Sequence, residues 1–107
     1  MVVETYRTTK GFPADERYGL VGQMRRSAVS IVSNVAEGAS RHSKKDFARF
    51  VYAARGSASE LETQIIVSHE LGYLDEGQKQ GLLMAIDDIQ KMASGLVRFL
   101  NKSSSPS

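Results

Sequence analysis

The sequence predicts an all-α protein: an antiparallel up-down four-helix bundle with a shortened first helix. Apolar residues recur at spacings of three and four over most of the 107 residues, which is the period of a helix with one buried face. No stretch shows the strict alternation expected of strands. Proline occurs only at Pro13 and Pro106, so it interrupts no helix between them. Short connections then place consecutive helices antiparallel.

The first predicted helix is short and the second is long. Val2 to Lys10 spans about two turns and ends at Gly11-Phe12-Pro13. The second helix is expected from about Asp15 to Glu37, with Gly38 terminating it in a left-handed conformation. Its predicted core stripe and flanking valines are Leu20, Met24, Ala28, Ile31, Val35, Val21 and Val32. Its predicted polar face is Gln23, Arg26, Ser27, Ser30, Asn34 and Glu37.

The third helix is predicted to begin at a capping box and to end at a glycine. In Ser43-Lys44-Lys45-Asp46 the Ser43 hydroxyl can accept a hydrogen bond from the amide of the third helical residue. At the other end, Gly72 stops the helix. The predicted core positions are Phe47, Phe50, Val51, Ala54, Ala58, Leu61, Ile65 and Ser68. Ile66, Val67 and Leu71 point elsewhere, so this half of the helix carries more apolar surface than one bundle buries.

The fourth helix is predicted to begin at Asp75, with Gln78 three residues later completing a cap. Its core face is expected to be Leu82, Ile86, Ile89, Ala93, Leu96 and Leu100, flanked by Leu83 and Val97. The four helices together make residues 1–101 one bundle. Residues 102–107, rich in serine, are expected to form a disordered tail.

Composition excludes several protein classes. There is no cysteine, which rules out disulfides and thiolate metal sites and is compatible with a reducing cytoplasm, where we expect the protein. No apolar run is long enough to span a membrane, and no secretory signal opens the chain. The net charge of +2 is too small to indicate nucleic-acid binding by itself. Charge is uneven, however, with an excess of +4 from Arg41 to Arg55 and of −3 from Asp75 to Gln90.

The sequence does not indicate an enzyme, a metal site or a cofactor. His42 and His69 are the two histidines, neither follows a glutamate at the spacing of di-iron bundles, and no phosphate-binding or nucleophile motif occurs. We interpret His69 as a packed, hydrogen-bonded side chain and His42 as solvated. Glu60 and Glu62 lie two residues apart and so do not face each other on a helix. Glu60 is expected to pair with a basic residue on a neighbouring helix.

A cluster of basic residues is the best candidate for a functional site. We expect one corner of the bundle to combine the loop residues with two arginines of the preceding helix: Arg25, Arg26, Arg41, Lys44, Lys45 and Arg49. Such side chains neutralise phosphates, so the cluster predicts salt-dependent binding of RNA or DNA. The alternative interpretation is an ordinary solvated loop.

A run of small residues around Arg55 suggests close helix contacts. Tight packing within the chain explains most of the run, and a subunit contact is the alternative. The residues predicted to contact other subunits are Val29, Arg55, Gly56, Glu60, Ile66, Val67 and Leu71.

Several motifs occur together: Y-G-L-x-x-Q-x-R-R-S-A-V-S-I-x-x-N-V-A-E-G, S-K-K-D-F-x-R-F, A-R-G-S-x-S-E-L-E-T-Q and L-G-Y-L. From about Thr5 to Leu100 the chain closely resembles the four-helix-bundle proteins first noticed as products of intervening sequences in bacterial large-subunit ribosomal RNA. The accessory protein of diversity-generating retroelements looks like a relative. The resemblance implies a homopentameric ring and no catalytic residues. In the retroelement accessory protein, a basic surface engages nucleic acid and a reverse transcriptase.

The start of the chain departs from this family pattern, because it resembles only the last turns of a longer first helix. We therefore expect Leu96, Leu100 or parts of the second and third helices to be uncovered, and a neighbouring chain to cover the gap. The first functional hypothesis is a non-enzymatic oligomeric adaptor that binds RNA or DNA. The second is a structural or protein-interaction scaffold whose surplus apolar residues recruit partner helices.

Overall fold

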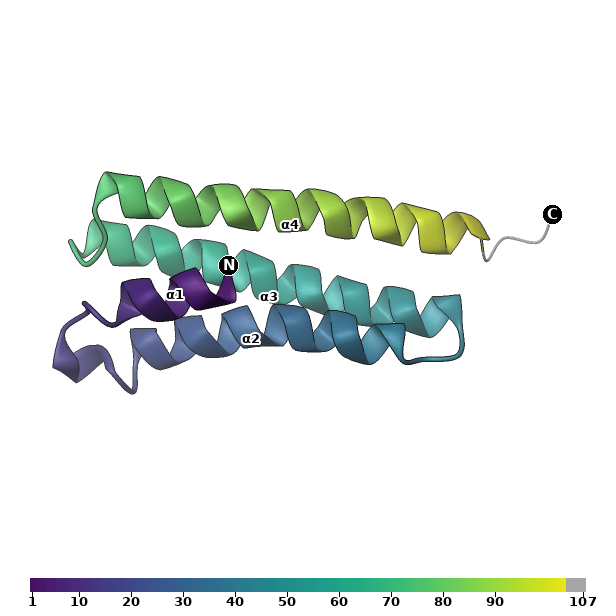
Figure 1. The fold of residues 1–107 in the computed structure, drawn as a ribbon, viewed down its shortest axis with the longest axis horizontal. Helices are drawn as coiled ribbons and strands as arrows, with labels where there is room; N and C mark the ends of the chain where they lie inside the picture. Colours follow the sequence, from purple (N-terminus) through teal and green to yellow (C-terminus); the bar gives the residue numbers. More distant parts are fainter. Residues whose placement is uncertain (104–107) are drawn as a thin grey trace.

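Four α-helices account for most of residues 1–103, the part of the chain that the computed structural model describes. They are α1 (Val2–Thr9), α2 (Leu20–Ala39), α3 (Lys44–Glu70) and α4 (Glu76–Ser103), with a 3-10 turn, η1 (Ala14–Glu16), between α1 and α2. The three long helices run antiparallel along the 54 Å axis of the molecule, and α1 lies along only one half of it (Figure 1). The predicted all-α bundle with a short first helix is confirmed.

The ends of α3 and α4 form as the sequence predicts. The Ser43 hydroxyl accepts a hydrogen bond from the Asp46 amide at 3.0 Å. Asp75 and Gln78 make a reciprocal cap, in which the Gln78 amide donates to Asp75 Oδ1 at 2.7 Å and the Asp75 amide donates to Gln78 Oε1 at 2.9 Å. Gly72, with φ of +82°, ends α3 in the left-handed region that favours glycine. These contacts satisfy backbone groups that a helix end leaves free.

The predicted ends of the second helix are wrong in two respects. The 3-10 turn precedes it, so α2 begins at Leu20 rather than near Asp15. Gly38 lies inside the helix, which continues to Ala39, and among the described residues Gly72 alone has a positive φ. Gly38 instead permits close packing, because a Cβ atom there would lie 2.8 Å from Phe50 Cβ and 2.9 Å from Phe47 Cδ1. Contact with α3, rather than backbone conformation, explains this glycine.

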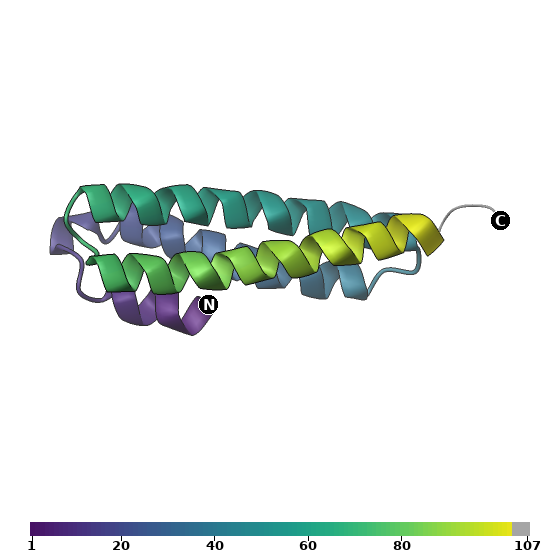
Figure 2. The same cartoon turned by 90° about the horizontal axis from the view of Figure 1, so that it is seen from above.

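The core follows the predicted stripes through most of the bundle. Met24, Leu61, Ile65 and Ile86 are fully buried in a cluster that joins α2, α3 and α4. A second cluster at the other end contains Val51 and the last apolar residues of α4. Figure 2 shows α3 and α4 side by side along their whole length. The α3 stripe is therefore the centre of the core.

Three expectations about burial are wrong. Val35 and Val32 are exposed rather than buried, because α1 does not reach their half of α2. Ser27, assigned to the polar face, is buried. Of the residues that the short first helix was expected to leave uncovered, Leu96 is partly exposed, whereas Leu100 is buried in the second core cluster, in keeping with its place on the predicted core face.

The predicted boundary of the tail is also slightly wrong. The helix α4 continues through Ser103, two residues beyond the expected end of the bundle at Asn101. The rest of the predicted tail, residues 104–107, lies outside the described residues.

The connection between α1 and α2 is attached to the connection between α3 and α4 through Tyr73. The Tyr73 hydroxyl donates a hydrogen bond to Glu16 Oε2 at 3.0 Å, and the Tyr73 ring lies 5.3 Å from that of Phe12. The hydrogen bond to the Glu16 carboxylate, together with burial, raises the pKa of Tyr73 above its ordinary value. This contact holds η1 against the connection between α3 and α4.

Replacing Gly38 by alanine tests the close approach of α2 and α3. We expect Gly38→Ala to lower the free energy of unfolding by about 1–3 kcal/mol, because overpacking outweighs the better helix propensity of alanine. Gly56→Ala is the matched control, since nothing lies within 4 Å of a Cβ atom at Gly56. It should stabilise the protein by about 0.5–1 kcal/mol. Urea unfolding measures both, and equal stabilisation by the two substitutions would contradict the packing argument.

The raised pKa of Tyr73 predicts a loss of stability at alkaline pH. A folded-state pKa above the unfolded value of about 10 means that the contact stabilises the fold fully below that pH. Its contribution is lost as the pH rises through the folded-state pKa. Thermal unfolding from neutral to strongly alkaline pH should show a steeper decline for the parent than for Tyr73→Phe, which keeps the ring. Identical declines would mean that the hydroxyl contributes nothing.

Candidate nucleic-acid interface

One end of the bundle carries a dense group of basic residues. The α2–α3 loop and the start of α3 lie at the same end as the last turns of α4 (Figure 1). Lys44 Nζ lies 5.9 Å from the centre of the Phe99 ring, which joins the two helices there. The basic end, as we call it, comprises Arg41, Lys44, Lys45, Arg49, Arg98 and Lys102, and its acidic residues are Glu37 and Asp46. Arg98 and Lys102 are additions that the sequence pattern did not indicate, because they lie more than forty residues away along the chain.

Two of these basic side chains have acidic neighbours within their own helix or loop. Arg41 pairs with Glu37 and stacks on the Phe50 ring, with its guanidinium carbon 4.9 Å from the ring centre. Arg49 pairs with Asp46 at 3.1 Å. Exposed pairs of this kind stabilise a protein little and exchange partners readily. Lys44 and Lys45 are exposed and make no ion pair with any described residue. The basic end therefore keeps its positive charge accessible.

Arg25 does not belong to the basic end, contrary to the prediction. It lies about 20 Å from the loop along α2, given a rise of 1.5 Å per residue. Its guanidinium group donates to Thr9 Oγ1 at 3.0 Å and to the Tyr6 carbonyl at 3.3 Å, and it stacks 4.6 Å from the centre of the Tyr6 ring. Arg25 thus attaches α1 to α2. The sequence pattern grouped it with the loop because both are basic.

Arg26 is also distant from the basic end. It is exposed beside a polar seam between α2 and α3, whose lining includes Ser30, Ser57 and Glu60. The hydroxyls of Ser30 and Ser57 lie 2.8 Å apart and share a hydrogen bond across the seam. Glu60 makes no ion pair with a described residue, so the pairing expected with a neighbouring helix is not made within one chain. The structure therefore divides the predicted nucleic-acid-binding residues into a compact group of four and two outliers.

The histidines do not form a catalytic arrangement. His69 is partly buried, and its Nε2 lies 3.1 Å from Glu76 Oε2 at the junction of α3 and α4, as expected of a packed side chain. The pKa of Glu76 is lowered, chiefly by a hydrogen bond from Gln80 and further by a hydrogen bond from Lys79 and the charges of Lys79 and His69. Among residues 1–103, no three histidine, aspartate or glutamate side chains come together as metal ligands would.

The residues predicted to contact other subunits lie on two flanks of α3 and on α2. Gly56, Glu60, Val67 and Leu71 share one flank, because they recur at helical spacing. Arg55 and Ile66 lie toward α4, whose Gln90 donates to the Arg55 carbonyl at 3.1 Å. The apolar members, Val29, Ile66, Val67 and Leu71, are all exposed. Subunit contact at these positions stays a prediction.

The fold and the basic end define a class: antiparallel four-helix bundles with a cationic end and no evident metal centre among the described residues. The chain belongs to the 23S rRNA-intervening sequence protein family, whose model matches residues 1–95. A crystal structure of a protein with unknown function from the S23 ribosomal protein family of Bacteroides thetaiotaomicron is similar, with a TM-score of 0.79. The two chains are 21% identical, and the match covers 90% of this chain and 87% of that one. No curated protein matches the sequence.

Among residues 1–103, none of the helices combines the length and apolar character needed to cross a bilayer.

The contacts of Arg25 predict a structural role. Arg25→Gln should lower the free energy of unfolding by about 1–2 kcal/mol, because it removes the stacking on Tyr6 and charge-assisted hydrogen bonds to α1. RNA affinity should hardly change. Arg26→Gln is the control and should alter stability by less than about 0.5 kcal/mol, as is usual for an exposed side chain. Urea unfolding and RNA titration measure both variants. A large loss of RNA affinity in Arg25→Gln would mean that Arg25 belongs to the binding surface after all.

Proposed function

We propose that this protein is a non-enzymatic adaptor that binds RNA or DNA phosphates through its basic end. The observation that carries the proposal is the convergence of basic residues from two distant parts of the sequence, 41–49 and 98–102, at one end of the bundle. Lys and Arg side chains that are exposed and close together neutralise adjacent phosphates and release their counterions. The positive end of the α3 dipole adds to this potential.

The opposite end of the bundle supports the proposal by its charge. It carries five acids, Asp15, Glu16, Glu70, Asp75 and Glu76, against the basic residues Lys10, Arg17 and Lys79, and so has an excess of negative charge. These acids are separated from the basic end by most of the 54 Å length of the molecule. Since exposed charges are screened within about 8 Å at physiological salt, each end acts on its surroundings independently. A polyanion would therefore approach the basic end although the net charge is only +2.

Self-association would strengthen such binding. In a homo-oligomer, such as the pentamer that the resemblance implies, several basic ends would engage one nucleic acid together. Their combined affinity would exceed that of a single basic end through avidity. An adaptor also needs a second ligand, and a protein such as a reverse transcriptase is the candidate that the resemblance suggests. A cytoplasmic location fits this role, because RNA is available there and a chain without cysteine is compatible with a reducing compartment.

A protein-interaction scaffold without a nucleic-acid role is the second candidate. One flank of α3 favours it, because Val67 and Leu71 are 42% and 53% exposed and lie in line with Gly56, which has open space around it. Exposed apolar residues aligned beside a glycine are typical of a surface that another helix packs against.

Charge reversal at the basic end tests the nucleic-acid proposal. We expect the parent protein to bind a labelled structured RNA with an affinity that falls steeply as salt increases. Lys44→Glu/Lys45→Glu should weaken binding by about tenfold or more and reduce the slope of log affinity against log salt by roughly 1–2 units. Fluorescence anisotropy over a range of salt concentrations measures both quantities.

The matched control is Lys10→Glu/Arg17→Glu, which makes the same change in net charge at the opposite end with side chains that are also exposed. It should leave RNA affinity nearly unchanged. If both double variants weaken RNA binding equally, the effect depends on net charge and not on the basic end. Weak binding by every form would favour the scaffold.

A further inference from the structure

Tyr52 is an exposed aromatic residue on α3, at the border of the basic end. Its side chain is 51% exposed. Asn101 Nδ2 of α4 donates a long hydrogen bond of 3.5 Å to Tyr52 Oη, so the ring lies beside the last turns of α4. Side chains on a helix lean toward its N-terminus, and for Tyr52 this is the direction of the basic end (Figure 1). The basic end therefore has an aromatic ring at its edge.

The ring of Tyr52 has an open face. The Phe99 ring at the same end already has a cation against it, because Lys44 Nζ lies 5.9 Å from its centre. No ring and no cation from residues 1–103 stacks on Tyr52. Gly56, one turn further along α3, has no side chain, and nothing lies within 4 Å of where a Cβ atom would be. A planar group therefore has room to lie against the Tyr52 ring.

Basic side chains of α3 lie on the same face as Tyr52. Arg49 precedes it by one turn and Lys45 by two turns, and both are exposed. The contact of Arg49 with Asp46 is an exposed ion pair, which contributes little to stability and does not fix the guanidinium group in place. Two positive charges and one open ring therefore follow one another along this face of the helix.

Arg98 of α4 borders the same surface from the other side. It precedes Asn101 by one turn and is exposed. It also lines a shallow depression together with Gln90, whose side chain donates to the Arg55 carbonyl at 3.1 Å. Because Arg55 lies one turn from Tyr52 on α3, this side of α4 faces the flank that carries the ring. Basic residues from two helices thus flank a single exposed tyrosine.

We propose that the Tyr52 ring stacks on an unpaired base of a single-stranded nucleic acid. Lys45 and Arg49 on one side and Arg98 on the other would hold the neighbouring phosphates. This inference rests on the proposed function and deepens it, because it names the form of nucleic acid that the basic end prefers. The bases of a duplex are stacked on one another, so only an unpaired nucleotide presents a free face to the ring.

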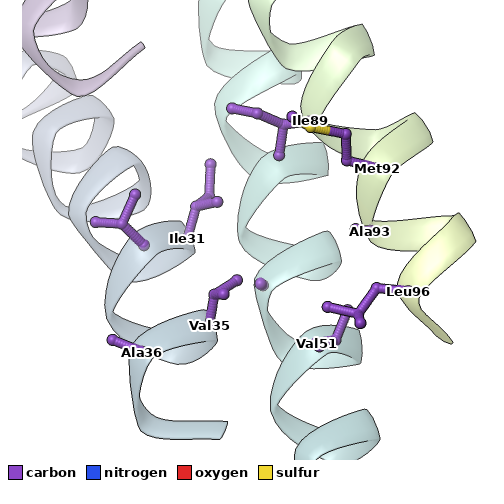
Figure 3. Close-up of a pocket in the computed structure, with 10 residues that line it drawn as sticks. Ile31, Val35, Ala36, Val51, Ile89, Met92, Ala93 and Leu96 are labelled. Carbon is purple, nitrogen blue, oxygen red and sulfur yellow. The ribbon is translucent and has the colours of Figure 1, made fainter. Parts of the chain in front are cut away.

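The apolar groove between α2 and α4 offers no such site. It has a volume of about 430 Å³, and Figure 3 shows its walls, with Val35 and Ala36 on α2 and Met92 and Leu96 on α4. Every residue that lines this groove is apolar, so none of them attracts a phosphate. Charge and aromatic surface occur together on the flank of α3 and α4 that carries Tyr52, and a strand is expected to follow that flank.

A comparison of single-stranded and duplex RNA tests the proposal. The probe is a labelled strand of about 12 nucleotides of alternating adenosine and cytidine, used alone or annealed to its complement. Charge by itself favours the duplex, which carries more phosphates in the same length. We nevertheless expect the full chain to bind the single strand several-fold more tightly in fluorescence anisotropy. The same strand made of DNA should bind within a few-fold of the RNA, because the bases and phosphates are common to both.

Removal of the ring should abolish this preference. Tyr52→Ala should weaken binding of the single strand by about 5–100-fold, the usual effect of losing one stacked base, and should leave duplex affinity nearly unchanged. The dependence of affinity on salt should stay the same, since no charge is removed. Tyr52→Phe keeps the ring and should bind nearly as well as the parent.

Tyr18→Ala is the matched control. Tyr18 is 89% exposed and lies in the connection between η1 and α2, at the opposite end of the bundle. Its removal should leave the affinity for both forms of RNA unchanged. Tyr52 and Tyr18 are both exposed, so neither substitution disturbs the core, and circular dichroism checks that each variant is folded.

Tyr52→Trp reports the stacking directly. The protein contains no tryptophan, so the fluorescence of this variant comes from position 52 when the indole is excited selectively. The single strand should quench that fluorescence and bind at least as tightly as it binds the parent, because the indole has the larger face. The duplex should quench it much less.

Failure of this inference differs from failure of the proposed function. Suppose that Tyr52→Ala binds the single strand as well as Tyr18→Ala does, while Lys44→Glu/Lys45→Glu still weakens binding. Stacking on Tyr52 would then be wrong, and the basic end would remain a phosphate-binding surface. Equal affinity for strand and duplex, or a large loss of affinity in the DNA strand, would also overturn the inference. If the parent bound neither form at low salt, the proposed function itself would fail.

Discussion

The burial of one stripe of α3 against two neighbours is the interaction on which the rest of this structure depends. Val51, Leu61 and Ile65 are fully buried, and the small residues Ala54 and Ala58 between them let α2 and α4 approach closely. Removing these side chains from water is the dominant favourable contribution to such a core. Because α3 is the shared partner and the connections on both sides of it are short, α2 and α4 both run antiparallel to it.

Two consequences follow from this arrangement. First, the start of α3 and the end of α4 meet at one end of the bundle, so basic residues from distant parts of the sequence are brought together there. Second, α2 and α4 flank α3 and leave a seam between themselves. The helix α1 has only eight residues and fills half of that seam. The same packing that makes the basic end compact thus also produces the apolar groove that leads toward it.

The positions of the helices, the two ends of α3 and the start of α4 were predictable because they depend on neighbours in the sequence. Ser43, Asp75 and Gln78 act on amides three residues away, and Gly72 acts through its own backbone. The wrong predictions concern residues whose surroundings depend on tertiary contacts. Val35 continues the stripe of Met24, yet it is exposed because the helix that would cover it is absent from that half of the seam. Of the predicted nucleic-acid site, residues 41–49 were grouped correctly by proximity, whereas Arg25 serves the contact with α1.

The sequence by itself determined the fold class, the number of helices, the caps of α3 and of the start of α4, and most of the apolar face of each helix. These properties arise from a period of 3.6 residues and from short-range hydrogen bonds, both of which can be read along the chain. Only the tertiary structure decided that Gly38 is a point of contact rather than a helix end, that Arg98 and Lys102 join the basic end, and that an apolar groove lies open between α2 and α4. Each of these depends on which helices are neighbours in space, and the periodicity of one helix does not contain that information.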